Sequence, residues 1–189
     1  LPERQLVSGY AELYKYAFIG GNDMFEFVGS QHDNMLAQKP DILQEGIRRS
    51  IAIKARIVSA DEQESGTRAL LNFGHTFAHA IEHYFNFENV LHGEAVFRGI
   101  ACACDLGKRI NSIPPETQSA YNELLEKLVC PELPARPDSA RLYDAMFSDK
   151  KVAGGKLRFI VPAEPGRSVI TSDIPEETVI QTLETLCGD

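Results

Sequence analysis

Three of the five histidines in the chain fall within nine residues of one another. His75, His79 and His83 follow at intervals of four, which places them on or near one face of a helix. Two neutral imidazoles at this spacing can each direct a nitrogen at a divalent metal, about 2.0–2.1 Å away. A fourth histidine, His92, follows closely. The pattern indicates a metal site, although such spacing also arises by chance, and His83 suits a surface or packing role.

Two histidines alone would leave a metal underligated, because a catalytic zinc usually has three protein ligands and one open position. Glu12 is a candidate third ligand, since it lies in an otherwise apolar helix start, GYAELYK at residues 9–15. The alternative for Glu12 is a surface ion pair with Lys15 at i, i+3, which contributes a few tenths of a kcal/mol. The residues alone favour the ion pair.

A group of basic residues could hold a phosphate or a carboxylate: Lys54, Arg68, Lys150 and Lys151. Each by itself is more often a solvated surface charge. Arg68 is the most suggestive, because a guanidinium can grip a carboxylate with two hydrogen bonds. It also precedes Asn72 by one helical turn and His75 by two, on an expected shared face.

The elements that must position these residues are mainly helical. Apolar residues at threes and fours, with Gly and Pro between segments, predict helices over 9–20 (after Ser8 as N-cap), 23–31, a long segment from 40, 67–85, 93–109, 115–129, 139–147 and 175–186. The period changes to two over 156–161 and 168–171, which predicts a hairpin. We therefore expect a mainly α, multi-helix domain with a small β-hairpin near its C-terminus.

Composition excludes several classes of protein. Nineteen Lys and Arg against 27 Asp and Glu give a net charge of −8, which argues against a nucleic-acid partner. No apolar run approaches the roughly 20 residues needed to cross a bilayer, and no signal peptide opens the chain, so we expect no membrane partner. The four cysteines are too sparse for a disulfide framework. These features favour a cytoplasmic protein.

Several separated motifs resemble the 3-dehydroquinate synthase family and occur in its order. They are SGYAELYK at 8–15, Lys54, RALLNFGHTFAHAIE at 68–82, HGEAV at 92–96 and DKKVAGGKLRF at 149–159. The match spans nearly the whole chain. One departure is Ala78, where the family usually has a second glycine in GHTFGH, and another is the bulkier Phe97-Arg98 after HGEAV.

The resemblance implies roles for individual residues. Glu12, His75 and His92 would hold the metal, which makes His79 a polar substrate contact rather than a ligand. Lys15 and His79 would be catalytic. The implied substrate-binding residues are Lys54, Arg68, Asn72, Lys150 and Lys151, with Arg68 and Asn72 on the substrate carboxylate.

The activity implied by the resemblance is that of a phosphorus–oxygen lyase of the shikimate pathway and aromatic amino acid biosynthesis. It converts 3-deoxy-D-arabino-heptulosonate 7-phosphate, a phosphorylated keto acid, to 3-dehydroquinate and phosphate, with NAD and zinc or cobalt. No glycine-rich phosphate-binding turn follows a strand in this sequence. We therefore expect residues 1–189 to be the C-terminal metal- and substrate-binding domain, with the N-terminal NAD-binding α/β domain absent. The chain alone would be inactive, and a homodimer is a further expectation for the full-length enzyme.

Two related classes remain as alternatives. Another sugar phosphate cyclase, making an inosose or valiolone ring, would not need Arg68 and Asn72 for a carboxylate. A metal-dependent polyol dehydrogenase has a related helical domain but does not need the basic set. A helical module that binds metal without turnover is the non-enzymatic alternative.

Overall fold

The computed structural model describes residues 2–61, 66–128, 132–147 and 156–187. Its helices are α1 (Glu3–Lys15), α2 (Asn22–Leu36), α3 (Pro40–Ala60), α4 (His75–Tyr84), α5 (His92–Arg109), α6 (Gln118–Glu126), α7 (Ser139–Met146) and α8 (Glu176–Cys187), with 3-10 segments η1 (Tyr16–Phe18), η2 (Thr67–Asn72) and η3 (Pro115–Thr117). Strands β1 (Arg158–Glu164) and β2 (Arg167–Ser172) form an antiparallel hairpin. The expectation of a mainly helical domain with a hairpin near its C-terminus is confirmed.

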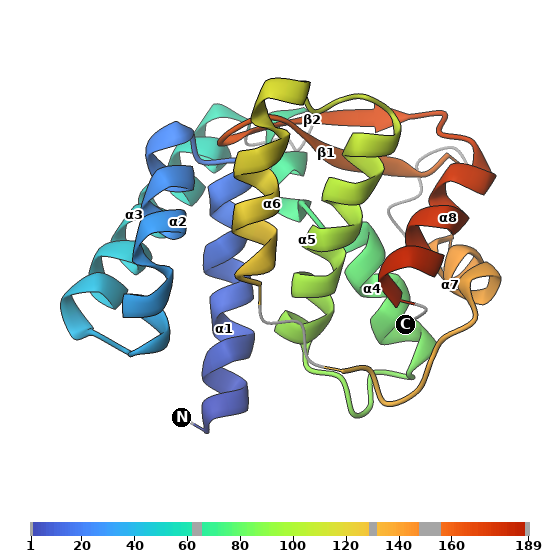
Figure 1. Cartoon of the computed structure of the whole chain (residues 1–189), viewed down its shortest axis with the longest axis horizontal. Coiled ribbons are helices and arrows are strands. Elements are labelled where there is room, and N and C mark those ends of the chain that lie inside the picture. Colours follow the sequence, from blue (N-terminus) through green and yellow to red (C-terminus); the bar gives the residue numbers. More distant parts are fainter. Residues whose placement is uncertain (1, 62–65, 129–131, 148–155, 188–189) are drawn as a thin grey trace.

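Helix α5 is the centre of the fold. It packs against α1, α4, α8 and strand β1, and Figure 1 shows it between α1 on one side and α4 and α8 on the other. Small and apolar side chains make this possible, because most of α5 is buried, including Ala95, Val96, Ile100 and Leu106. A helix that is apolar on most sides belongs in the core rather than on the surface.

Two glycines of α5 allow its neighbours to approach closely. A Cβ added at Gly93 would lie 1.9 Å from the carbonyl oxygen of Ser8 in α1. A Cβ at Gly99 would lie 2.1 Å from the carbonyl oxygen of Gly74, just before α4. Both distances are far below van der Waals contact. Glycine, which has no side chain, is therefore needed at these two positions for α1 and the residues before α4 to come this near to α5.

The first predicted helix begins earlier than expected. The sequence predicts a start after Ser8 as N-cap, but α1 begins at Glu3, with Pro2 at the N-cap position. Ser8 does not cap this helix. Its hydroxyl instead accepts a hydrogen bond from the backbone N–H of Gly93, at 3.1 Å. A serine in a tertiary contact carries the same sequence signal as a capping serine.

The segment predicted as one helix over 67–85 is two elements. Segment η2 ends at Asn72, and α4 begins at His75 after Gly74, whose φ of 77° lies in the left-handed region. Glycine adopts this conformation at little cost. Arg68 and Asn72 therefore do not share a helix face with His75, and this part of the expectation was wrong.

The remaining elements lie where expected, with differences at their ends. The first helix stops at Lys15 and is followed by η1, short of the predicted end at residue 20, whereas α2 runs to Leu36, beyond the predicted 23–31. Asp138 caps α7 by accepting from the backbone N–H of Arg141 at 2.8 Å. Cys102, Cys104 and Cys187 are buried and are not in disulfide bonds, and the sulfurs of Cys102 and Cys187 lie 3.9 Å apart. Cys130 lies outside the described residues. In the described part of the chain, no helix combines the length and the apolar character that a membrane span requires.

Candidate metal centre

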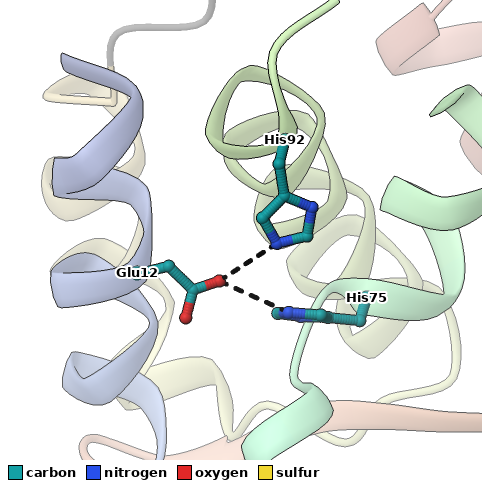
Figure 2. A group of neighbouring side chains, drawn as sticks. All are labelled: Glu12, His75 and His92. Atoms are coloured by element: carbon teal, nitrogen blue, oxygen red, sulfur yellow. Dashed lines mark ion pairs between the residues drawn. The ribbon is translucent and has the colours of Figure 1, made fainter. Parts of the chain in front are cut away.

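Glu12, His75 and His92 bring one ligand atom each to a common point (Figure 2), and their ligand atoms lie within 4.8 Å of one another. Glu12 Oε1 lies 3.3 Å from His75 Nε2 and 3.5 Å from His92 Nε2. Donor atoms about 2.0–2.1 Å from a tetrahedral zinc lie about 3.3–3.4 Å from one another. The two separations from Glu12 Oε1 therefore match those of ligands on one metal.

Three elements supply these side chains. Glu12 lies on α1, whereas His75 and His92 are the first residues of α4 and α5. The start of α5 is held by Glu94, whose Oε2 accepts from the backbone N–H of Leu91 at 2.8 Å. Glu94 also pairs with Arg4 of α1. This pair ties the helix of Glu12 to the helix of His92.

Hydrogen bonds through the far nitrogens orient both imidazoles. His75 Nδ1 lies 3.0 Å from the carbonyl oxygen of Phe73, so its Nδ1–H donates and Nε2 faces Glu12. His92 Nδ1 lies 3.0 Å from Glu82 Oε1, which gives the same assignment. Histidines that bind metals almost always donate their other N–H in this way.

The two oxygens of Glu12 have different surroundings. Oε2 accepts a hydrogen bond from the Lys15 ammonium at 2.6 Å. Oε1 is inaccessible to solvent and has no hydrogen-bond partner among the described residues, although the two imidazole nitrogens face it. A buried acceptor without a donor is costly, and a metal ion at the common point would satisfy it. The donor set and this orphaned oxygen both fit a divalent metal.

The charges of the site favour a cation. Burial raises the pKa of Glu12, but the imidazoles of His75 and His92 and the Lys15 ammonium outweigh it and hold this pKa well below its usual range. The Glu12 carboxylate, followed by that of Glu82, raises the pKa of His92 to about 9. The same carboxylates that stabilise a positive imidazole would stabilise a metal ion between the rings.

The site is open on one side. The His75 side chain is 12% exposed, whereas those of Glu12 and His92 are 41% and 49% exposed. His79 lies beside the group, with its ring centroid 5.6 Å from that of His75 and 6.5 Å from that of His92. A molecule entering from the open side could therefore contact both a bound metal and the neighbouring polar residues. His83 is exposed, as expected of a surface residue.

The residues expected to bind substrate are less closely grouped. Arg68 and Asn72 are half-buried in η2, which leads directly into His75, and Lys54 is exposed on α3, which packs against η2. Lys15 is buried beside Glu12. Lys150 and Lys151 lie outside the described residues.

Two carboxylates beside these residues were not given a role from the sequence. Glu82 follows His75 by seven residues, two helical turns along α4, a spacing that could have identified it as facing the site. Asp61 is buried, and its Oδ2 accepts from the backbone N–H groups of Gly66 at 2.7 Å and Arg68 at 3.0 Å. Asp61 therefore fixes the entry into η2, but backbone hydrogen bonds of this kind leave no spacing signal.

The fold and the site define a class of protein: helical domains in which one carboxylate and two histidines converge on a point that could hold a metal ion. The comparisons with known proteins define the family. Residues 9–152 match the family model described as 3-dehydroquinate synthase C-terminal. The chain belongs to this family, as its motifs indicate. It is 41% identical over 187 residues to the 3-dehydroquinate synthase of Acinetobacter baumannii (strain AYE), a match covering 97% of this chain and 51% of that protein.

A second relative gives the same proportions. The 3-dehydroquinate synthase of Nitrosomonas europaea is 39% identical over 189 residues, covering 100% of this chain and 51% of the relative. The chain thus spans about half the length of the curated relatives it matches.

Two solved structures share the fold. The 2-epi-5-epi-valiolone synthase from Streptomyces hygroscopicus subsp. jinggangensis 5008, with NAD+ and Zn2+ bound, superposes with a TM-score of 0.84 at 22% identity, covering 98% of this chain and 52% of that one. A 2-deoxy-scyllo-inosose synthase complexed with carbaglucose-6-phosphate, NAD+ and Co2+ gives a TM-score of 0.82 at 25% identity, with 98% and 53% coverage. The first likeness concerns the fold alone.

Proposed function

We propose that this chain is the metal- and substrate-binding half of a 3-dehydroquinate synthase. The whole enzyme would convert 3-deoxy-D-arabino-heptulosonate 7-phosphate to 3-dehydroquinate and phosphate in the shikimate pathway. The observation that carries the proposal is the convergence of Glu12, His75 and His92 from three helices around an unsatisfied carboxylate oxygen. Membership of the 3-dehydroquinate synthase C-terminal family supports it.

The cofactors of the proposed enzyme are a divalent metal and NAD. Glu12, His75 and His92 would hold the metal, and this donor set suits zinc or cobalt. A bound metal supplies Lewis-acid stabilisation of substrate oxygens, and NAD supplies hydride transfer that no side chain can perform. The NAD site would lie mostly in an N-terminal domain outside residues 1–189.

The protein's own residues would bind and orient the substrate. Arg68 would hold the substrate carboxylate with two parallel N–H donors, and Asn72 would donate its amide N–H to the same group. Lys54, Lys150 and Lys151 would neutralise the phosphate. Lys15 Nζ and the His79 imidazole would contact the reacting hydroxyls beside the metal and act in proton transfer. If all these side chains held the substrate in one pocket, its reacting groups would stay oriented from one step to the next, and no step would need a new encounter.

The setting of the proposed enzyme is the cytoplasm, with no nucleic-acid or membrane partner. Its partners would be the phosphorylated keto acid substrate, the N-terminal half of the enzyme and, in the full-length protein, a second copy forming a homodimer. The acidic net charge of −8 fits the absence of a nucleic-acid partner.

A chimeric enzyme tests the proposal. Residues 1–189 would be joined to the N-terminal half of the Acinetobacter baumannii relative, and phosphate release from 3-deoxy-D-arabino-heptulosonate 7-phosphate measured with NAD and Co2+. We expect turnover by the chimera, none by residues 1–189 alone, and none by the chimera carrying Glu12→Ala. A folded, metal-loaded chimera without turnover would contradict the proposed activity.

A second candidate is another sugar phosphate cyclase, because the inosose synthase shares the fold at 25% identity. The substrate decides between the two. Glucose 6-phosphate carries no carboxylate for Arg68 and Asn72. We expect the chimera to release phosphate from the keto acid and not from glucose 6-phosphate, and the reverse result would favour the second candidate.

A further inference from the structure

Glu82 is a nearly buried carboxylate that none of the proposed substrate or metal contacts uses. Its side chain is only 11% exposed, and it lies near the end of α4, two turns after His75. Burying a carboxylate is costly unless hydrogen bonds or a positive group compensate it. Its contact is with His92, at 3.0 Å between Glu82 Oε1 and Nδ1.

This contact determines which nitrogen of His92 faces the site. With Nδ1–H donating to Glu82, the lone pair of Nε2 is directed at the point that His75 Nε2 and Glu12 Oε1 share. Without an acceptor on the Nδ1 side, the ring could place its proton on either nitrogen and rotate about its side-chain bonds.

The two histidines depend on their acceptors to different degrees. His75 is 12% exposed and donates to a backbone carbonyl, that of Phe73, which the turn before α4 fixes. His92 is 49% exposed and is oriented by a side chain. Packing therefore restrains His75, whereas His92 relies on Glu82.

Glu82 also adds charge. The carboxylate of Glu12 is shared with the Lys15 ammonium through its other oxygen, at 2.6 Å. A second carboxylate behind His92 increases the electron density that this imidazole offers to a cation, as carboxylate–histidine pairs do in zinc proteins.

We propose that Glu82 is a positioning residue of the metal centre, which holds His92 through Nδ1 so that Nε2 is a ligand. The inference rests on the proposed function, since it requires that Glu12, His75 and His92 bind a metal. Outer-shell partners of this kind typically alter metal affinity 10–100-fold when they are removed.

The experiment titrates Co2+ into the chelator-treated 189-residue chain and follows the visible d–d absorption, which reports both affinity and coordination geometry. The variants are Glu82→Ala and Glu82→Gln. The matched control is Asp105→Asn, which removes a carboxylate paired with Arg109 on α5, about 20 Å along the helix from His92.

We expect Glu82→Ala to weaken Co2+ binding about 10–100-fold and to shift the d–d bands. Glu82→Gln retains an oxygen acceptor for the Nδ1–H of His92 but loses the charge. We therefore expect a smaller decrease in Co2+ affinity than for Glu82→Ala, with d–d bands nearer those of the original chain. Asp105→Asn should leave both the Co2+ affinity and the d–d bands unchanged.

Wild-type affinity and bands in Glu82→Ala would overturn the role of Glu82 while leaving the proposed metal site intact. If Glu82→Ala does not fold by circular dichroism, Glu82→Gln decides, and a wild-type Kd in that variant overturns the role. If the unmutated chain does not bind Co2+, the metal site and the role of Glu82 fail together.

Discussion

Gly93 of α5 lies against Ser8 of α1 so closely that a Cβ on the glycine would come within 1.9 Å of the serine carbonyl oxygen. This contact lies one residue from His92 and one helical turn from Glu12. The absence of one side chain thus sets the distance between two proposed ligands.

Gly93→Ala should therefore damage both the fold and the site. The added methyl would push α1 from α5, and overpacking of this kind costs about 1–3 kcal/mol. We expect a lower midpoint in urea and weaker Co2+ binding. The control is Gly9→Ala on α1, where a Cβ meets nothing within 4 Å. That change should leave metal binding intact and stabilise the helix by about 0.5–1 kcal/mol. Equal effects of the two substitutions would contradict this account.

The proposed ligand set predicts which histidines the metal requires. Glu12→Ala and His92→Ala should each lower the zinc content of the purified chain, measured by elemental analysis, because each removes one of three donors around one point. His79→Ala should retain the metal. If His79→Ala loses the metal and His92→Ala does not, the i, i+4 pair is the ligand pair and the proposed set is wrong.

A ligand that binds only the folded state raises its stability, so zinc should raise the melting temperature. At 100 times the Kd, the gain is about 2.7 kcal/mol. For a chain of this length, that corresponds to about 5–10 °C. Differential scanning calorimetry with zinc and with a chelator measures the shift. His75→Ala should melt at the same temperature in both conditions, and a zinc-dependent shift in this variant would point to binding elsewhere.

The Arg4–Glu94 pair predicts a pH dependence of stability. Burial raises the pKa of Glu94, but the Arg4 guanidinium and the Leu91 N–H outweigh it and lower this pKa below the ordinary value of 4.5. Because the pKa is lower in the folded state, the stabilisation is fully present above pH 4.5 and is lost as the pH falls through the folded-state value.

Glu94→Gln removes this titration. At pH 7, we expect the free energy of unfolding of this variant to be lower than that of the original chain by about 1 kcal/mol. The loss is no larger because Arg4, one partner of the pair, is exposed. The difference between the two should shrink as the pH is lowered below 4.5. Urea unfolding at several pH values measures it, and a difference that stays constant with pH would exclude the ionised Glu94 as its source.

The spacing of apolar residues and the order of the motifs predicted the helices better than the points where they begin or break. Apolar periodicity located α3 and α5, because a long helix with a buried face repeats its signal over many residues. It missed the break at Gly74, since one glycine in a helical pattern is compatible with continuation as well as with a left-handed turn. It also misplaced the start of α1, because Ser8 serves a tertiary contact that leaves no local trace.

The candidate site shows a similar division. The i, i+4 spacing favoured His75 with His79, and the family resemblance favoured His92 instead, a residue on a different helix. The structure groups His92 with His75 and Glu12 through the packing of α1 and α4 on α5. Such convergence depends on interhelical distance, which no spacing along one helix encodes. The contact between Glu82 of α4 and His92 of α5 could not be predicted from the sequence for the same reason.

The distribution of the ligand residues along the chain has a consequence for folding. Among the described residues, two helices (α2 and α3) and two 3-10 segments (η1 and η2) separate Glu12 from His75, and they must form and dock before the ligand atoms meet. In a zinc finger, the ligands are close in sequence and the ion drives folding itself. Here the ion-binding point exists only after long-range loops have closed and α5 is enclosed on both sides. A metal ion would therefore slow unfolding rather than initiate folding, and chelation should leave the refolding rate nearly unchanged.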